Sequence, residues 1–297
     1  MARILFRALS VVVSLLLFAQ VGLARAKQNA GRTEERSGEV TSAMELPFRL
    51  LDGYLIVVEG RIGEQGHLKF ALDTGATFSV LRTALARPEF ARRTRQVVNL
   101  DRVLNEEVVD VSDFQLGPIR ISSLPMMLNT FEYLGSDAPQ VDAVIGLDVL
   151  RLRSFTIDFA RKRILLGQAR VLRFGVPLET NSSYISVEVR SKNEPLRLLL
   201  DTGVPSILLY RDRVSDRMPK VQVARTIPAR SLGGVASLDL VTLPRVQLGQ
   251  HDLDRRAVMS DKSPTDFLPG IDGYLSLMSL GARICGISWE EGALSWE

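Results

Sequence analysis

Two stretches of the sequence decide how the rest is interpreted: LKFALDTG at residues 68–75 and LRLLLDTG at residues 196–203. In each, an apolar run of the kind that forms a buried strand leads directly into Asp-Thr-Gly. A single Asp-Thr-Gly is weak evidence, because these three residues are common in turns. Its recurrence after the same kind of strand indicates that the chain contains a repeated unit.

The repeat extends well beyond these motifs. Pro47 and Tyr54 recur as Pro177 and Tyr184, in the segment that comes before the strand leading into each Asp-Thr-Gly. Later blocks continue in the same order: residues 114–117 align with 246–249, 142–147 with 272–277, and 155–159 with 285–289. We therefore expect residues 44–170 and 171–297 to be two copies of one unit.

Within each copy the patterns favour strands. Residues 54–59, 68–72, 184–189 and 196–200 are rich in β-branched and other apolar residues and are bounded by turn residues. Helical patterning is confined to residues 82–92 and 147–151. The sequence thus predicts an all-β protein made of barrels or sandwiches.

The paired motifs also predict chemistry. Two carboxylates held close together cannot both ionise, so Asp73 and Asp201 would share one proton and act together as general acid and general base. A glycine after each Asp-Thr, Gly75 and Gly203, permits a tight turn and a close approach of the backbone. The hydroxyls of Thr74 and Thr202 can tie one loop to the other.

With these residues, the sequence resembles the aspartic peptidases, in which each lobe contributes one Asp-Thr-Gly. Residues 144–150, VIGLDVL, match a second landmark of that family, two apolar residues and a glycine before a short helix. The resemblance implies two pseudo-symmetric β-barrel lobes with the active-site cleft between them, and Asp73 and Asp201 as the catalytic pair. It also implies a peptide or protein substrate, no metal and no cofactor.

The second copy departs from this pattern at two places. Ser276 stands where the landmark has glycine, and Val204 and Pro205 follow the second Asp-Thr-Gly. These changes leave open a non-catalytic peptide-binding or sensor module that retains the fold. If Ser276 narrows the site, Ser276→Gly should leave activity equal or higher.

Family members cover the cleft with a hairpin flap. In the second copy, Leu232, Gly233 and Gly234 have the glycine content of a mobile tip. The matching residues 100–109 of the first copy contain no glycine. Either the two flaps work asymmetrically or the first is a stiffer wall of the cleft.

The N-terminus predicts export. Arg3 and Arg7 precede an apolar stretch over residues 8–24 that ends in a small-x-small cleavage site, so residues 1–26 are expected to be a signal peptide. An uncleaved anchor is the alternative, and only then would the protein associate with a membrane. A polar leader, residues 27–43, follows, and we expect a periplasmic or secreted protein.

Composition excludes several other classes. Without residues 1–26 the chain carries 34 basic and 34 acidic residues, so its charge gives no reason to expect nucleic acid as a partner. Two histidines and the single Cys285 leave too few ligands for a histidine-rich metal site. Both candidate carboxylates lie in one chain, so we expect a monomer.

Four other acidic residues lie near the landmarks and are expected to be structural. Asp148 and Asp158 have no acidic counterpart in the other copy, whereas Asp142 and Asp272 are paired but precede apolar strands, where turn residues are common. Cys285 aligns with Phe155, which predicts a buried apolar role.

Overall fold

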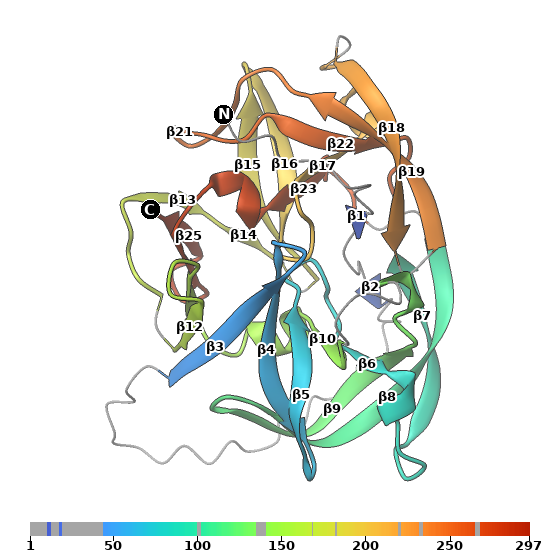
Figure 1. The fold of residues 1–297 in the computed structure, drawn as a ribbon. Helices are drawn as coiled ribbons and strands as arrows, with labels where there is room; N and C mark the ends of the chain where they lie inside the picture. The colour runs from blue at the N-terminus through green and yellow to red at the C-terminus, as the bar shows by residue number, and fades with distance from the viewer. Residues whose placement is uncertain are drawn as a thin grey trace.

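The computed structural model describes residues 11–12, 18–19, 44–99, 102–134, 141–167, 169–181, 183–218, 221–231, 234–264 and 268–297. They form an almost all-β protein of two lobes, one below the other in Figure 1. Most of the predicted signal peptide, residues 1–26, and all of the polar leader, residues 27–43, lie outside the described residues. Both remain predictions.

The first lobe consists of strands with three single-turn helices. Its elements are β3 (Met44–Leu51), β4 (Leu55–Ile62), β5 (Gln65–Leu72), β6 (Val80–Arg82), η1 (Thr83–Leu85), β7 (Arg92–Asn99), β8 (Arg102–Leu116), β9 (Ile119–Asn129), η2 (Glu132–Leu134), β10 (Ala143–Ile145) and α1 (Leu147–Leu150).

The second lobe repeats this order. Its elements are β14 (Glu179–Thr180), β15 (Ile185–Ser191), β16 (Glu194–Asp201), β17 (Ile207–Tyr210), α2 (Arg211–Val214), β18 (Gln222–Ser231), β19 (Gly234–Thr242), β20 (Val246–Leu248), β21 (His251–Asp252), β22 (Arg256–Ser260), β23 (Gly273–Ser276) and η3 (Leu277–Leu280). The all-β prediction is confirmed, and the four predicted strands fall on β4, β5, β15 and β16.

The strand before each Asp-Thr-Gly pairs in parallel with the late apolar strand of the same lobe. Leu72 on β5 lies beside Ile145 on β10, and Leu200 on β16 lies beside Leu275 on β23. The residues that pair in these strands are buried, as parallel strands usually are. The two Asp-Thr-Gly motifs therefore begin at equivalent strand ends in the two lobes.

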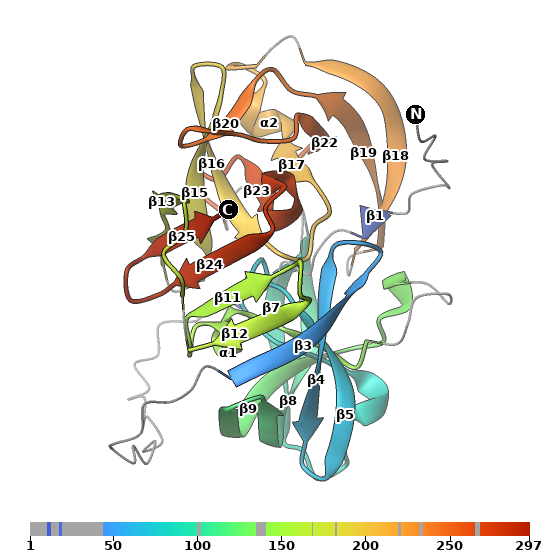
Figure 2. The same ribbon diagram turned by 60° about the vertical axis from the view of Figure 1, so that its left-hand side comes forward.

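A shared sheet joins the lobes. Strands β11 (Phe155–Asp158) and β12 (Arg163–Leu166) pair with β3 on one side, while β24 (Ile284–Ser288) and β25 (Ala293–Trp296) pair with β13 (Phe174–Pro177) on the other. The two halves meet where β11 runs antiparallel to β24, with Thr156 opposite Gly286 (Figure 2). This continuous sheet fixes how the lobes face each other.

The core of the shared sheet contains Cys285, which the sequence predicted to be buried. Cys285 and Trp296 are both buried there. Burial raises the pKa of the Cys285 thiol to about 12, so it is not a reactive thiolate near neutral pH. The predicted structural role of Cys285 is confirmed.

Each lobe contains a long hairpin that follows its Asp-Thr-Gly loop: β7–β8 in the first and β18–β19 in the second (Figure 1). Two short strands of the N-terminal segment extend their edges. Val11–Val12 (β1) pairs with β18, and Phe18–Ala19 (β2) pairs with β7.

The predicted helix over residues 82–92 is wrong. Only Thr83–Leu85 form a helical turn, and the chain then enters β7 at Arg92. Pro88 interrupts the pattern, because the residue before a proline is disfavoured in helical conformation. The basic side chains at the start of β7 pair across the hairpin, Arg92 with Glu107 and Arg93 with Asp110. The other predicted helix is confirmed as α1.

Both α-helices in the described part of the chain have only four residues. Among the residues that can be described, no helix has the length and apolar character needed to cross a membrane.

Candidate active site

The two Asp-Thr-Gly loops are bonded to each other by their threonines. The Thr74 N–H donates to Thr202 Oγ1 at 3.0 Å, and the Thr202 N–H donates to Thr74 Oγ1 at 3.1 Å. Each hydroxyl in turn donates across to the strand of the opposite lobe, Thr74 to the Leu200 carbonyl and Thr202 to the Leu72 carbonyl, both at 2.8 Å. These four buried bonds join the two loops reciprocally.

Each aspartate carboxylate is held by its own loop. Asp73 Oδ1 accepts bonds from the N–H groups of Gly75 at 2.9 Å and Ala76 at 3.2 Å. Asp201 Oδ1 accepts a bond from the N–H of Gly203 at 2.7 Å. Both aspartates are almost fully buried, so their positions are fixed by the turn rather than by solvent.

The two carboxylates meet at Gly75. The N–H of this glycine binds Asp73, while a Cβ at the same residue would lie 2.4 Å from Asp201 Oδ2. No real side chain tolerates that distance, so glycine is required here by the close approach of the second lobe. The structure thus brings Asp73, Gly75 and Asp201 together.

In the first lobe, a buried polar network supports the loop from behind. Asp148 Oδ2 and Oδ1 accept bonds from the Ser79 N–H at 3.0 Å and the Ser79 hydroxyl at 2.7 Å, and the Gly146 N–H donates to the same hydroxyl at 3.1 Å. Burial raises the pKa of Asp148 to about 6, against the opposing effect of the Ser79 hydrogen bonds. Asp148 therefore anchors the segment that follows Asp73, in keeping with its predicted structural role.

In the second lobe, hydrogen bonds of the Ser276 hydroxyl take the place of this network. Its hydroxyl donates to the Val204 carbonyl at 2.6 Å and accepts from the Met278 N–H at 3.1 Å, which caps η3. At the equivalent Gly146 a Cβ would lie 2.7 Å from the Ala76 carbonyl oxygen. The serine hydroxyl thus makes two bonds that a glycine could not make, while the expected effect of Ser276→Gly on activity stays a prediction. Pro205 lies half-buried in the turn before β17.

Asp142 and Asp272 have matching structural roles. Asp142 Oδ2 accepts a bond from the Lys69 N–H at 2.8 Å, and Asp272 Oδ2 accepts one from the Arg197 N–H at 2.9 Å. Each therefore ties the start of a late apolar strand to the strand that carries the motif aspartate.

The buried Tyr54 and the partly buried Tyr133, whose hydroxyl is shielded from solvent, lie in the electrostatic field of the aspartates. Burial raises the pKa of Tyr54, and the charges of nearby carboxylates, including Asp201 and Asp73, raise it further. Burial also raises the pKa of Tyr133, with Asp73 as the next cause. The sequence marked Tyr54 only as a residue of the repeat, and no pattern singled out Tyr133.

The predicted flap residue Gly234 lies in the hairpin β18–β19. Ser231 pairs with Gly234, which begins β19, so the predicted tip falls between them. Leu232 and Gly233 lie outside the described residues. The first lobe has a hairpin of the same form, in which Asn99 pairs with Arg102. From Arg102 onward, the glycine-free stretch of the first copy therefore belongs to β8, the returning strand of a second hairpin, while residues 100 and 101 lie outside the described residues.

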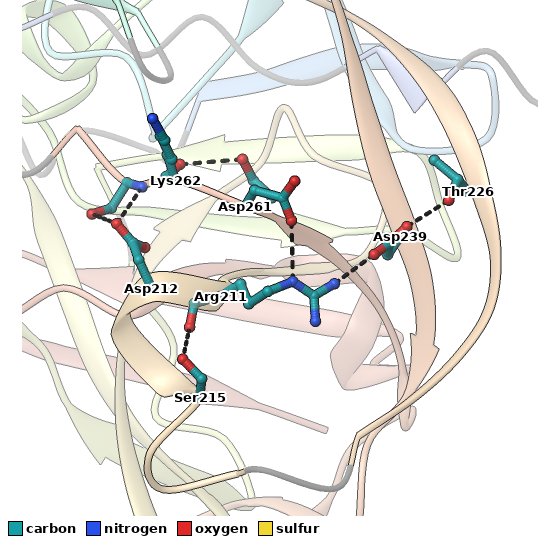
Figure 3. Close-up of polar contacts among 9 residues, drawn as sticks. Arg211, Asp212, Ser215, Thr226, Asp239, Asp261 and Lys262 are labelled. Atoms are coloured by element: carbon teal, nitrogen blue, oxygen red, sulfur yellow. Dashed lines mark hydrogen bonds and ion pairs between the residues drawn. The ribbon is translucent and has the colours of Figure 1, made fainter.

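Arg211 of α2 anchors the second-lobe hairpin at its base (Figure 3). Its guanidinium donates to Asp239 on β19 and to Asp261 after β22, the latter at 3.1 Å. Asp239 also accepts a bond from the Thr226 hydroxyl on β18 at 2.6 Å, so both strands of the hairpin join one network.

Over the described ranges, no group of three or more His, Cys, Asp or Glu side chains is arranged to hold a metal ion.

Comparison with known proteins identifies the family. The family model described as aspartyl protease matches residues 58–149 and 185–281, one segment in each copy of the repeat. None of the curated proteins compared with the sequence matches it. Solved structures similar to this one include basic 7S globulin from soybean (9% identity, TM-score 0.47, 86% of this chain and 95% of that one) and the aspartic proteinase from Irpex lacteus (13% identity, TM-score 0.48, 86% and 96%). Because the family model covers more than half of the sequence, this chain belongs to the aspartyl protease family.

Proposed function

We propose that this protein is an aspartic endopeptidase, which hydrolyses peptide bonds by activating water between Asp73 and Asp201. The observation that carries the proposal is the meeting of the two carboxylates at Gly75, in loops locked by the reciprocal threonine bonds. This arrangement is costly to build and has no use in a purely structural protein, because buried like charges repel.

The chemistry follows from the shared proton. The ionised aspartate removes a proton from the water, whose oxygen attacks the peptide carbonyl carbon, while the protonated aspartate donates its proton to the carbonyl oxygen. The resulting tetrahedral diol collapses as the C–N bond breaks: the aspartate that took the water's proton gives it to the nitrogen, and the other aspartate takes a proton from a diol hydroxyl, which restores the starting pair. Backbone N–H groups hold each carboxylate at the position that the reaction requires.

The substrate we propose is an extended peptide, bound by main-chain hydrogen bonds to the hairpin edges. The pairing of Val11–Val12 with β18 and of Phe18–Ala19 with β7 supports this, because both edges accept an added strand (Figure 1). Strand addition supplies affinity, whereas side-chain pockets supply specificity.

The decisive experiment uses purified residues 27–297 and a denatured protein or a peptide library. We expect the wild type to cleave it, with inhibition by a statine-containing peptide that mimics the tetrahedral diol. Asp73→Asn and Asp201→Asn should each lower kcat by at least roughly 100-fold while circular dichroism stays unchanged. Asp216→Asn, at an exposed position, is the matched control and should retain activity.

Retention of near-wild-type activity by either folded Asn variant of the pair would refute the shared-proton mechanism. If the wild type binds the statine peptide but cleaves nothing, the non-catalytic peptide-binding module is the correct function instead.

We further propose that the protein is exported, cleaved after Ala26 and active as a monomer. Mass spectrometry of the N-terminus from a native-like host tests the cleavage, and intact residues 1–26 on membrane-bound protein would favour an anchor. Sedimentation tests the monomer, and activity confined to a dimer would contradict it.

A further inference from the structure

Tyr133 carries a polar atom that the proposed mechanism does not use. Its hydroxyl is shielded from solvent and, within the described part of the chain, has no hydrogen-bond partner. Burying a hydroxyl without a partner is unfavourable, because the bonds it makes to water in the unfolded chain are not replaced. A group that binds there only during function would supply the missing partner.

The ring of Tyr133 is held in place by its neighbours. It lies on η2, in edge-to-face contact with Phe131 at 6.1 Å between ring centroids. The Phe131 N–H donates to Asn129 Oδ1 at 2.7 Å, which fixes the start of this turn. The ring packs against the apolar cluster that contains Tyr54 and the first-lobe hairpin residue Val97. The hydroxyl therefore cannot easily turn away to reach solvent.

The position of η2 places this hydroxyl beside the proposed cleft. The helix belongs to the first lobe, yet it lies against β18, the hairpin strand of the second lobe. The same apolar cluster contains Val108 of the first-lobe hairpin and Val144, which precedes the landmark glycine. Tyr133 thus lies between the two hairpins, on the side of the site that carries Asp73.

The electrostatic surroundings make the hydroxyl a hydrogen-bond donor. Burial, then the charges of Asp73 and Tyr54, raise the pKa of Tyr133 well above its ordinary value, with Arg82 opposing. The Arg82 guanidinium donates a hydrogen bond to the Val141 carbonyl, and its Nε lies 3.8 Å from Asp142 Oδ1. The phenol therefore remains protonated over the whole range in which an aspartic peptidase works.

We propose that Tyr133 is a specificity-determining residue, whose hydroxyl donates a hydrogen bond to an acceptor atom on the substrate side chain beside Asp73. This inference rests on the proposed function. The hairpin edges already hold the main chain of an extended peptide, so a group set back among apolar side chains meets a substrate side chain. The apolar surroundings favour a side chain with an apolar body and an uncharged oxygen near its tip, such as glutamine or tyrosine. A carboxylate would be repelled by Asp73.

The test uses peptide substrates that differ only in this acceptor. Glutamine is compared with methionine, and tyrosine with phenylalanine, at each of the two positions that flank the cleaved bond. For the wild type we expect kcat/KM to favour the acceptor by about 10-fold or more at one position, because the unsatisfied hydroxyl penalises the isostere. Tyr133→Phe should bring that ratio close to 1.

Tyr210→Phe is the matched control. Tyr210 is a buried tyrosine of the second lobe whose hydroxyl bonds the Tyr274 hydroxyl at 2.7 Å, so its loss also removes a buried hydroxyl. It should leave the acceptor preference unchanged. Circular dichroism of both variants checks that they are folded.

An acceptor preference that survives in folded Tyr133→Phe would overturn the inference. A uniform loss of kcat/KM over all the peptides would also overturn it, because that result indicates a structural role. If the wild type cleaves no peptide, the proposed function fails separately. The inference is then decided by calorimetry with statine peptides carrying the same side-chain pairs: equal affinities of wild type and Tyr133→Phe for every peptide would refute it.

Discussion

The carboxylate of Asp201, in the second lobe, occupies the space that a side chain on Gly75 of the first lobe would need. A Cβ built on Gly75 would lie 2.4 Å from Asp201 Oδ2 and 2.5 Å from its Cγ. The Gly75 N–H meanwhile holds Asp73. One glycine therefore sets how closely the two carboxylates approach.

Gly75→Ala should lower kcat at least 100-fold, because a small displacement of reacting groups is enough for such a loss. The added methyl group should also destabilise the fold by about 1–3 kcal/mol through overpacking. Urea unfolding and peptide cleavage measure the two effects. Gly66→Ala is the control, since a Cβ at Gly66 meets no atom within 4 Å. Equal effects of the two substitutions would refute the close approach.

The pH dependence of kcat/KM should be bell-shaped, with its maximum on the acidic side of neutral. Two coupled carboxylates hold one proton between two apparent pKa values that belong to the pair, and both the doubly protonated and the fully ionised forms are inactive. Cleavage rates across the pH range test this. A rate that keeps rising to high pH, with no descending limb, would contradict a shared proton.

Ser276→Gly should destabilise the protein by about 1–2 kcal/mol, because the variant loses the cap of η3 and the bond to the Val204 carbonyl. The reverse change, Gly146→Ser, should also be destabilising, since its Cβ would lie 2.7 Å from the Ala76 carbonyl oxygen. Urea unfolding compares both variants with the wild type. If Ser276→Gly were as stable as the wild type and more active, the serine would be a defect rather than an adaptation.

Asp148→Asn should make the free energy of unfolding less dependent on pH. The pKa of Asp148 is raised to about 6 in the folded protein, so the folded state binds this proton more tightly than the unfolded state does. The stability that Asp148 contributes is therefore complete at low pH and is lost as the pH rises through about 6. The variant carries no charge at this position. Relative to Asp148→Asn, the wild type should lose about 2–3 kcal/mol of unfolding free energy between pH 4 and pH 7. Parallel pH curves for the two proteins would show that the charge is not buried.

Arg211→Gln should loosen the second-lobe hairpin without unfolding the protein. The ion pairs of Arg211 are partly exposed, so their loss should lower stability by less than about 1 kcal/mol. Hydrogen exchange of the β18 and β19 amides should become faster, and KM should rise more than kcat falls. Arg245→Gln, which removes an exposed pair with Asp252, is the control. Unchanged exchange in Arg211→Gln would show that the network does not hold the hairpin.

Much of the fold could be predicted because the chain contains the same local information twice. The apolar runs before Asp73 and Asp201 predicted β5 and β16, and the landmark at residues 144–150 predicted β10 and α1. The prediction was wrong where a local pattern competed with distant pairing. Helical spacing over residues 82–92 could not reveal that β7 forms a hairpin with β8, whose strand bonds come from residues further along the chain.

The sequence by itself determined the repeat, the strand that precedes each Asp-Thr-Gly and the residue types in the two loops, because these depend on local periodicity and turn chemistry. Only the tertiary structure decided how Thr74 and Thr202 bond each other, why Gly75 cannot carry a side chain, and how Ser276 takes over a role that Ser79 and Asp148 share in the first lobe. It also decided that the Tyr133 hydroxyl is buried near Asp73. The physical reason is that each of these contacts joins atoms from segments far apart in the chain. Such contacts exist only after the shared sheet has packed one lobe against the other.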